Sequence, residues 1–580
     1  MSLRKAVRAI AVLAVVSIVA AACGGGTKTP GATASGTAKP TQGGKIVLGA
    51  EQWAPCVNPI TSCAGLTWTW YSVLEHVLAY AMVLDLNGNF VASPVLAEAP
   101  TLDNGGITQS PFTISYKISD KAVWADGTPI TSADIDFTWK AIMNTTGALT
   151  TVGYESIESI DTTDPKTAVI KFKEIYVDWP DLFGGVYAGF YEKAAFPKQN
   201  ASDKPNLKNE MLDNIPFSGG PWILKSWSKD QAVFTRNDKW FGTTSDARGP
   251  VPYLDQVTIV PRTDQPTEIQ SVLTGEVDAI YPQPSDTSLI DQVKGTPGVT
   301  AKGTDGAYFE SLWFNHASAP LDDPKVREAL MYAIDRQSII DAIIKLNNPN
   351  AEVLNCGILS FPNIGNWCKD VQPFSQFTYD PAKAKSLLEA DGYDCSASPC
   401  TKGGKPLVVG YSTVSTNTRR TTTQQLLQQK AKDAGFSFKV KNYDAEVLFG
   451  DILPHGTFTM ADYAQGGSVD PTVTSILGCD NIPTAANQYA GQNVNQWCNQ
   501  QATDLMKQSD QELDPAKRLQ LLDQVYQLQA QDFVSLPLYV LPSVGAWRAD
   551  KLGGPVDAYI PSNLGMFYNI NSWFLLKAAA

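Results

Sequence analysis

The alternation of hydrophobic and polar positions predicts a strand, a tight turn and a helix in the first quarter of the chain. Apolar side chains occupy every second position from Phe112 to Ile118, which is the period of a half-buried strand. Asp126 and Gly127 predict a turn, because glycine adopts positive φ without steric cost. Thr131 and Asp134 have the spacing of a capping box, so a helix is expected to begin there.

Strand and helix patterns alternate along the rest of the chain. An apolar strand is predicted at 45–50 and a helix at 68–80. Three later helices are predicted to begin at Asp-Pro pairs, at 323–324, 380–381 and 514–515. Asp caps the free amides of a first turn, and Pro fits the first helical position. This alternation predicts an α/β fold with mixed sheets flanked by helices.

The amino-acid composition indicates sizeable hydrophobic cores and an acidic surface. The 580 residues are 43% hydrophobic and 10% aromatic, which is enough for sizeable cores. The formal net charge is −13, and an acidic surface repels phosphate backbones and anionic lipid. We therefore expect no nucleic-acid partner.

The first residues have the pattern of a secretory leader. Three basic residues precede an apolar stretch at 9–20 that is too short to span a bilayer. Residues 20–23 resemble a lipobox, which predicts a signal peptide at 1–22 and lipidation of Cys23. The alternative is an ordinary cleavage site with an incidental cysteine. Residues 23–44 are rich in Gly, Thr, Pro, Ala and Ser, which predicts a flexible linker.

Eight cysteines follow Cys23, and their even number and local spacing predict disulfides formed in an oxidising compartment. The expected pairs are Cys56–Cys63, Cys356–Cys368, Cys395–Cys400 and Cys479–Cys498. Zinc is the rival interpretation, but the chain has no closely spaced Cys-x-x-Cys and only three scattered histidines. We expect no metal site.

Catalytic motifs are absent from the sequence. There is no P-loop, no His-Glu-x-x-His and no Gly-x-Ser-x-Gly. Ser226 and Lys229 satisfy Ser-x-x-Lys, but the Ser-Asp-Asn and Lys-Thr-Gly companions of that motif are missing. The abundant carboxylates leave a glycosidase pair open, although no stretch isolates one. Binding without catalysis is the better-supported class, and we expect neither enzyme activity nor a cofactor.

The segment that contains the predicted turn resembles a family signature. Residues 124–139 run Trp-Ala-Asp-Gly-Thr-Pro-Ile-Thr-Ser-Ala-Asp-Ile-Asp-Phe-Thr-Trp. This string is similar to the signature of the family 5 extracellular solute-binding proteins of ABC importers, which include dipeptide-, oligopeptide- and nickel-binding proteins. Further similar blocks lie at 215–242, 275–279 and 312–336, and the resemblance extends over roughly 45–574.

The resemblance implies the type II periplasmic-binding-protein fold, in which two lobes with mixed sheets are joined by a two-crossing hinge and accompanied by an extra domain. The implied boundaries are 45–85, 217–303 and 537–580 for lobe I, 86–216 for the extra domain and 304–536 for lobe II. Ligand is expected between the lobes, whose closure buries it.

The resemblance also implies the ligand-binding residues. The expected set is Asn58, Trp68, Tyr71, Tyr463, Ala464, Gln465, Gly466, Gly467 and Asp470. In peptide-binding members an Asp pairs with the peptide ammonium three residues before an Asp-Pro or Glu-Pro. Here Gly467 occupies that position, and Asp462 is the available substitute if the loop is rearranged. Glycines would let the backbone approach an extended peptide, a sugar or a lipid headgroup closely.

The implied function is that of an importer's substrate-binding subunit. Such a monomeric protein would be secreted, lipid-anchored to the outer face of the bacterial cell membrane, and would deliver peptides or similar small solutes to membrane permease subunits. A second hypothesis assigns the same fold to a surface lipoprotein that regulates or scaffolds envelope glycolipid assembly.

Overall fold

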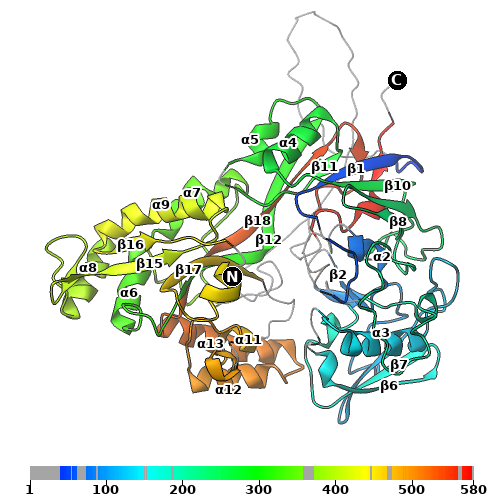
Figure 1. The fold of residues 1–580 in the computed structure, drawn as a ribbon, viewed down its shortest axis with the longest axis horizontal. Helices are drawn as coiled ribbons and strands as arrows, with labels where there is room; N and C mark the ends of the chain where they lie inside the picture. Colours follow the sequence, from blue (N-terminus) through cyan, green and yellow to red (C-terminus); the bar gives the residue numbers. More distant parts are fainter. Residues whose placement is uncertain are drawn as a thin grey trace, which may run out of the picture. The chain divides into compact units, whose positions relative to one another are not determined.

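A ten-stranded mixed sheet runs through the part of the chain that the structure describes (Figure 1). The computed structural model describes residues 39–577 except 54, 62–72, 86–88, 149–150, 152, 185–188, 247, 286, 357–370, 445–446, 467–472, 488, 490 and 559–564. In spatial order the strands are β16 (Ser437–Val440), β15 (Val408–Ser412), β17 (Met460–Gly466), β12 (Val299–Phe314), β18 (Ser535–Arg548), β11 (Ala279–Ile280), β1 (Lys45–Ala50), β10 (Gln256–Pro261), β9 (Ala232–Arg236) and β8 (Trp222–Trp227).

Each half of this sheet has its own parallel core. On one side β1 pairs in parallel with β10 and β11, and we call this half lobe I. On the other side β15 pairs in parallel with β16 and β17, and we call this half lobe II. Lobe I carries α4 (Gln265–Thr274) and α5 (Leu289–Val293). Strands and flanking helices confirm the predicted α/β fold class.

Lobe II holds most of the helices. They are α6 (Pro324–Ala333), α7 (Arg336–Ala342), α8 (Pro381–Ala390), α9 (Thr418–Asp433), α11 (Thr474–Leu477), α12 (Gln500–Ser509) and α13 (Pro515–Gln531). One apolar core lies between the sheet and α6–α9, and a second core holds residues of α11, α12 and α13. The three predicted Asp-Pro starts are confirmed, because Asp323, Asp380 and Asp514 each accept a hydrogen bond from an amide of the first turn.

The two long strands β12 and β18 connect the lobes, and their pairing is interrupted where they do so. Asp305 pairs with Pro542 and Phe309 with Val540, so residues 306–308 of β12 lie opposite a single residue of β18. Such a bulge bends a strand pair and increases its twist. β12 and β18 are thus the two chain crossings, and the break in their pairing lies at the hinge that the family resemblance implies.

A four-stranded antiparallel sheet forms the extra domain together with α3 (Ser132–Asn144) (Figure 1). Its strands are, in order, β4 (Ile107–Gln109), β5 (Phe112–Lys117), β7 (Thr167–Phe172) and β6 (Ile157–Asp164). Along β5, buried and half-exposed side chains alternate, which confirms the predicted half-buried strand. Thr131 and Asp134 form the predicted capping box at the start of α3.

The remaining strands form three short ladders. These are β2 (Met82–Leu84) with β3 (Phe90–Ala92), β13 (Thr401–Lys402) with β14 (Lys405–Pro406), and β19 (Leu552–Gly553) with β20 (Phe574–Leu575). The domain boundaries given above remain a prediction.

The prediction of a helix at 68–80 is wrong at the C-terminal end of that range. Among the described residues of that range, only α2 (Glu75–Val77) is α-helical, and the chain is already extended at Leu78. The reason is a bridge in which Ala79 pairs with Phe190 and accepts the Phe190 amide at 2.7 Å. A tertiary contact thus ends a segment whose local pattern favours helix.

Two of the predicted disulfides are present with both partners described. Cys395 bonds to Cys400, and Cys479 bonds to Cys498. Cys56 and Cys356 are also disulfide-bonded. Their predicted partners Cys63 and Cys368 lie outside the described residues, as do Cys23, the predicted signal peptide and most of the predicted linker.

Candidate ligand-binding site

The strand directions point the carboxyl ends of both parallel cores toward each other. β12 runs from lobe I into lobe II, and β11 has the same direction because both strands are antiparallel to β18. β1 and β10 run parallel to β11 and therefore have the same direction. β17 is antiparallel to β12 and parallel to β15, so the lobe II strands run back toward lobe I. Ligands of open α/β sheets bind outside the carboxyl ends of the strands, and here two such edges face a common space.

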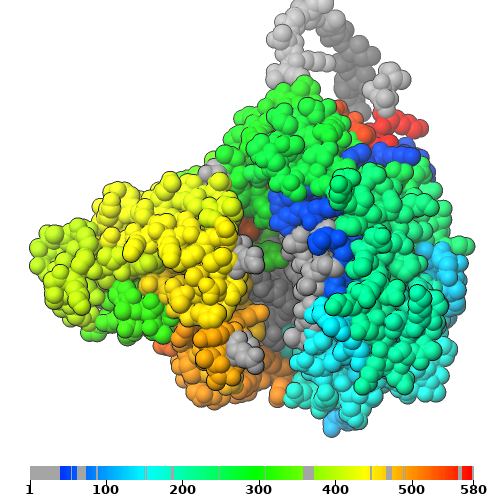
Figure 2. Space-filling view, viewed as in Figure 1, coloured from blue at the N-terminus to red at the C-terminus, as the bar shows by residue number. Residues whose placement is uncertain are grey.

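The surface of the described chain is grooved at this place. In Figure 2 a groove separates the yellow and orange surface of lobe II from the blue and cyan surface opposite. The last residue of β17, Gly466, pairs with Tyr308 in the bulge of β12. The loop predicted to bind ligand therefore starts directly beside the hinge, although its residues Gly467 and Asp470 lie outside the described part.

On lobe I, partly buried polar and aromatic side chains follow the carboxyl ends of β1 and β11. Glu51 accepts a hydrogen bond from the backbone amide of Gln283 at 2.6 Å, which ties the two loops together. The indole nitrogen of Trp53 donates to a backbone carbonyl at 2.9 Å. Tyr281 donates its hydroxyl to Ser543 of β18 at 2.8 Å. These loops are thus held against the crossing strands.

On lobe II an aromatic stack lies near the carboxyl end of β17. The predicted ligand residue Tyr463 is almost fully buried, and its ring stacks on Trp313 at 5.2 Å with an interplanar angle of 18°. Phe449 packs edge-on against Tyr463 at 5.6 Å and is itself 45% exposed. Phe449 belongs to a short π-helical turn at Leu448–Ile452, a conformation that is frequent at functional sites.

Sequence reasoning missed Phe449. Its sequence distance from the predicted loop gave no reason to connect the two, and only the folded strand brings the rings together. Ala464 and Gln465 lie on β17 opposite Glu310 and Phe309, and both are partly exposed. Gly466 is the last residue of β17. Ala464, Gln465 and Tyr463 therefore all lie on this one strand.

A fully buried charge network lies on the other face of the same strands. Glu310 of β12 accepts a hydrogen bond from Arg420 at 2.7 Å and forms an ion pair with Arg419 at 2.7 Å, and both arginines lie at the start of α9. Burial raises the pKa of Glu310, but the two guanidinium charges outweigh burial and lower it to about 2. Asp462 of β17 accepts the Tyr411 hydroxyl at 3.1 Å.

Asp462 is fully buried beside Glu310. Burial, and then the negative charge of Glu310, raise the pKa of Asp462 well above its ordinary value. A side chain with no exposed surface cannot contact the ammonium group of a ligand. In this conformation Asp462 therefore does not replace the ammonium-binding Asp whose position Gly467 occupies.

Asn58 has a structural role in this conformation. It is fully buried, and its side-chain amide donates to the carbonyls of Leu207 and Glu210 at 2.8 Å each. Its carbonyl oxygen accepts the amide of Ile60 at 3.0 Å. All of its polar atoms are thus used to hold the loop against the extra domain. The expected ligand residues Trp68 and Tyr71 lie outside the described residues.

Two further properties bear on the class of site. Within the described ranges, no three His, Cys, Asp or Glu residues come close enough to hold a metal ion. The same ranges contain no helix that is long and apolar enough to cross a membrane.

The comparisons with known proteins agree with this geometry. Residues 92–481 match the model of the bacterial extracellular solute-binding proteins, family 5. A protein of Brucella ovis named as an ABC transporter peptide-binding protein is 25% identical over 475 residues, which are 80% of this chain and 79% of that protein.

Two solved structures have the same fold. The periplasmic EDTA-binding protein EppA has a TM-score of 0.79 at 20% identity, with 94% of this chain and 98% of that chain covered. The oligopeptide-binding protein AppA of Bacillus subtilis, in complex with a nonapeptide, has a TM-score of 0.70 at 22% identity, with 93% and 100% covered. The family match spans more than half of the sequence, and the chain belongs to the bacterial extracellular solute-binding proteins, family 5.

Proposed function

We propose that this protein is the substrate-binding subunit of an ABC importer, which captures a peptide or a similar small solute between lobes I and II. The observation that carries the proposal is the pair of facing strand edges, with the interrupted pairing of β12 and β18 between them. Closing the lobes about that crossing would bury a ligand held at both edges. Family membership and the peptide-binding relative support the same function.

The proposed ligand contacts on lobe II are main-chain and aromatic. Gly466 and Gly467 leave the backbone free to pair with an extended ligand, because neither has a side chain in the way. Tyr463, stacked on Trp313, gives Phe449 a rigid support. A peptide with an apolar side chain satisfies both features, and it does not depend on a carboxylate at position 467.

The proposal extends to location and partners. Lipidation of Cys23 would anchor the protein outside the cell membrane, and residues 23–44 would tether it within reach of the permease. The protein would act as a monomer, since the two lobes of one chain supply both edges of the site. Nothing on the described residues favours the role in envelope assembly.

Native mass spectrometry of the freshly purified protein tests the proposal. Closed binding proteins retain their ligand, so we expect a population heavier than the mature chain by the mass of one small solute. Unfolding the sample should release that solute for identification. A chain without any bound solute, combined with no thermal stabilisation across a broad library of peptides and small solutes, would contradict the proposal.

Phe449→Ala tests the aromatic contact. We expect the variant to bind the identified solute about tenfold more weakly, which corresponds to about 1.4 kcal/mol, because an exposed aromatic platform is lost. Its thermal stability should be unchanged, since nearly half of the ring is already in solvent. Isothermal titration calorimetry measures the affinity.

Val440→Ala is the matched control for Phe449→Ala. Val440 ends β16 in the same lobe and is 39% exposed, and β15 separates its strand from β17, which carries Tyr463. Equal affinity losses in both variants would show that Phe449 does not touch the solute.

A further inference from the structure

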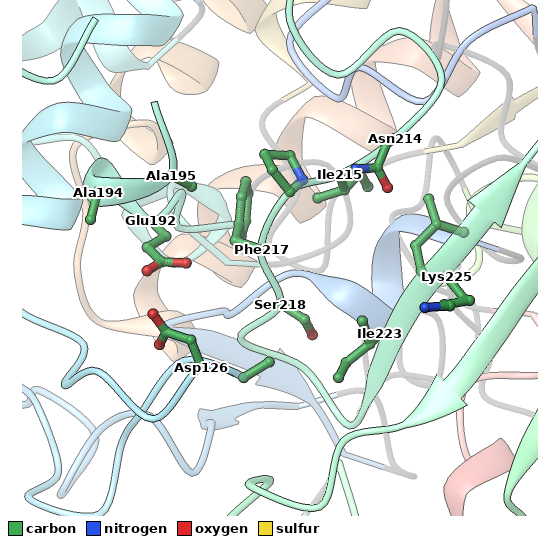
Figure 3. Close-up of a pocket in the computed structure, with 13 residues that line it drawn as sticks. Asp126, Glu192, Ala194, Ala195, Asn214, Ile215, Phe217, Ser218, Ile223 and Lys225 are labelled. Atoms are coloured by element: carbon green, nitrogen blue, oxygen red, sulfur yellow. The ribbon is translucent and has the colours of Figure 1, made fainter. Parts of the chain in front are cut away.

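A second cavity lies outside the facing strand edges, between the extra domain and the outer strand β8 of the main sheet. Its volume is about 460 Å³, a size that holds a small organic molecule. Its lining comes from the signature turn, the segment around η5 (Lys193–Ala195), the connection into β8, and β8 itself (Figure 3). None of these residues belongs to the proposed solute site.

Two carboxylates face each other at one end of this cavity. Figure 3 shows the side chains of Asp126 and Glu192 pointing toward one another. The hydroxyl of Thr128 lies between them, at 2.7 Å from Asp126 and 3.3 Å from Glu192. Asp126 is exposed, whereas Glu192 is only 7% exposed. Thr128 reaches one oxygen of each carboxylate, so both groups keep acceptor capacity for a ligand.

The rest of the lining is mainly apolar. Phe217 packs against Trp124 at 5.5 Å and against Phe196 at 5.9 Å, so its ring is fixed. Ile215 and Ile223 contribute aliphatic surface to the lining. The cavity therefore combines an anionic end with an apolar body, which is the complement of an amine that carries an apolar group.

We propose that this cavity is a binding site for an organic ammonium ion with an apolar body. Asp126 and Glu192 take the ammonium group, and Phe217 with Ile223 takes the apolar group. The ammonium ion donates to the remaining lone pairs of both carboxylates, and its charge relieves the repulsion between them.

The electrostatics of the cavity give the binding a pH dependence. Burial, followed by the charge of Asp126, raises the pKa of Glu192 to about 7. Asp134 adds a smaller effect in the same direction, although backbone amides of Thr131 and Lys193 already bond its carboxylate. Lys225 is the basic residue among those that line the cavity. Glu192 is therefore mostly neutral at pH 6 and mostly charged at pH 8.

Benzylamine is a suitable probe, because it remains protonated throughout this range and its ring fits the apolar lining. Saturation-transfer NMR titrations of the full mature chain at pH 6 and pH 8 measure its affinity. The fraction of protein in which Glu192 is charged rises from about one tenth at pH 6 to about nine tenths at pH 8. We therefore expect about tenfold tighter binding at pH 8. Glu192→Gln keeps the shape of the side chain and is expected to remove both the affinity and its pH dependence.

Glu174→Gln is the matched control, because Glu174 is an exposed carboxylate of the same domain. It should bind benzylamine as the natural protein does. Ile223→Trp fills the apolar part of the cavity from the edge strand β8 and should abolish binding while all carboxylates remain. Binding that persists in Glu192→Gln, that is equal at pH 6 and pH 8, or that is absent from the natural protein would overturn the proposal.

Discussion

Glu310→Gln is expected to lower the free energy of unfolding by about 3 kcal/mol at pH 7, because the change leaves Arg419 and Arg420 buried without their counter-charge. This loss of stability is at the low end of the range expected for breaking a buried ion pair. Asp462 can ionise once Glu310 is neutral, so part of the charge is replaced. Calorimetry or urea unfolding measures the change.

The neighbouring variant Asp462→Asn is the matched comparison. Its amide can donate to Glu310, and its carbonyl can accept the Tyr411 hydroxyl. We expect a much smaller loss than for Glu310→Gln. The double variant should lose more than the two single variants together, because Asp462 can then no longer supply a charge. Additive losses would show that the two acids do not share a proton.

The contribution of Glu310 also has a defined pH range. Its pKa in the folded protein, about 2, is lower than its ordinary value of 4.5. The stabilisation is therefore fully present above about pH 4.5 and is lost as the pH falls toward 2. Glu310→Gln and the natural protein should accordingly converge in stability on acidification.

Gly303→Ala is expected to destabilise the protein by about 3 kcal/mol. The added methyl group would lie 1.5 Å from the carbonyl oxygen of Asn347, which is backbone and cannot move aside. The side chain of Asn347 is also fixed, since it donates to the carbonyls of Ser285 and Thr287 and accepts the amide of Leu289. Gly303 lies on β12 just before the hinge, so a displaced strand should also weaken solute binding.

Gly450→Ala is the control for this variant. No atom lies within 4 Å of the added methyl group, and the residue is in a helical turn where alanine is preferred to glycine. Urea unfolding should show an unchanged or slightly raised midpoint. A Gly303→Ala variant as stable as Gly450→Ala would show that β12 can shift freely at this point.

Sequence patterns correctly predicted those structural elements that depend on residues nearby in the chain. The capping box of Thr131 and Asp134, the alternation along β5 and the Asp-Pro helix starts all depend on neighbours within a few residues. The end of the helix predicted at 68–80 was wrong because Phe190, more than a hundred residues away, pairs with Ala79. Family resemblance supplied the two-lobe fold, which periodicity alone could not.

The candidate site was less accessible to sequence reasoning. Tyr463 was proposed from the family pattern, but its support by Trp313 and Phe449 depends on strand pairing. Nothing in the sequence connects Glu310 with Arg419 and Asp462, because the strands and the helix that carry them are far apart along the chain. Burial also raises the pKa of Asp462, and burial is a property of the whole fold.

Closure about the two-strand hinge is the central claim, and small-angle X-ray scattering tests it most directly. The radius of gyration of the mature protein is measured after removal of the retained solute and again at saturation with that solute. We expect a smaller radius with solute bound, because the facing edges of lobes I and II approach each other. An unchanged radius at saturation would contradict capture between the lobes.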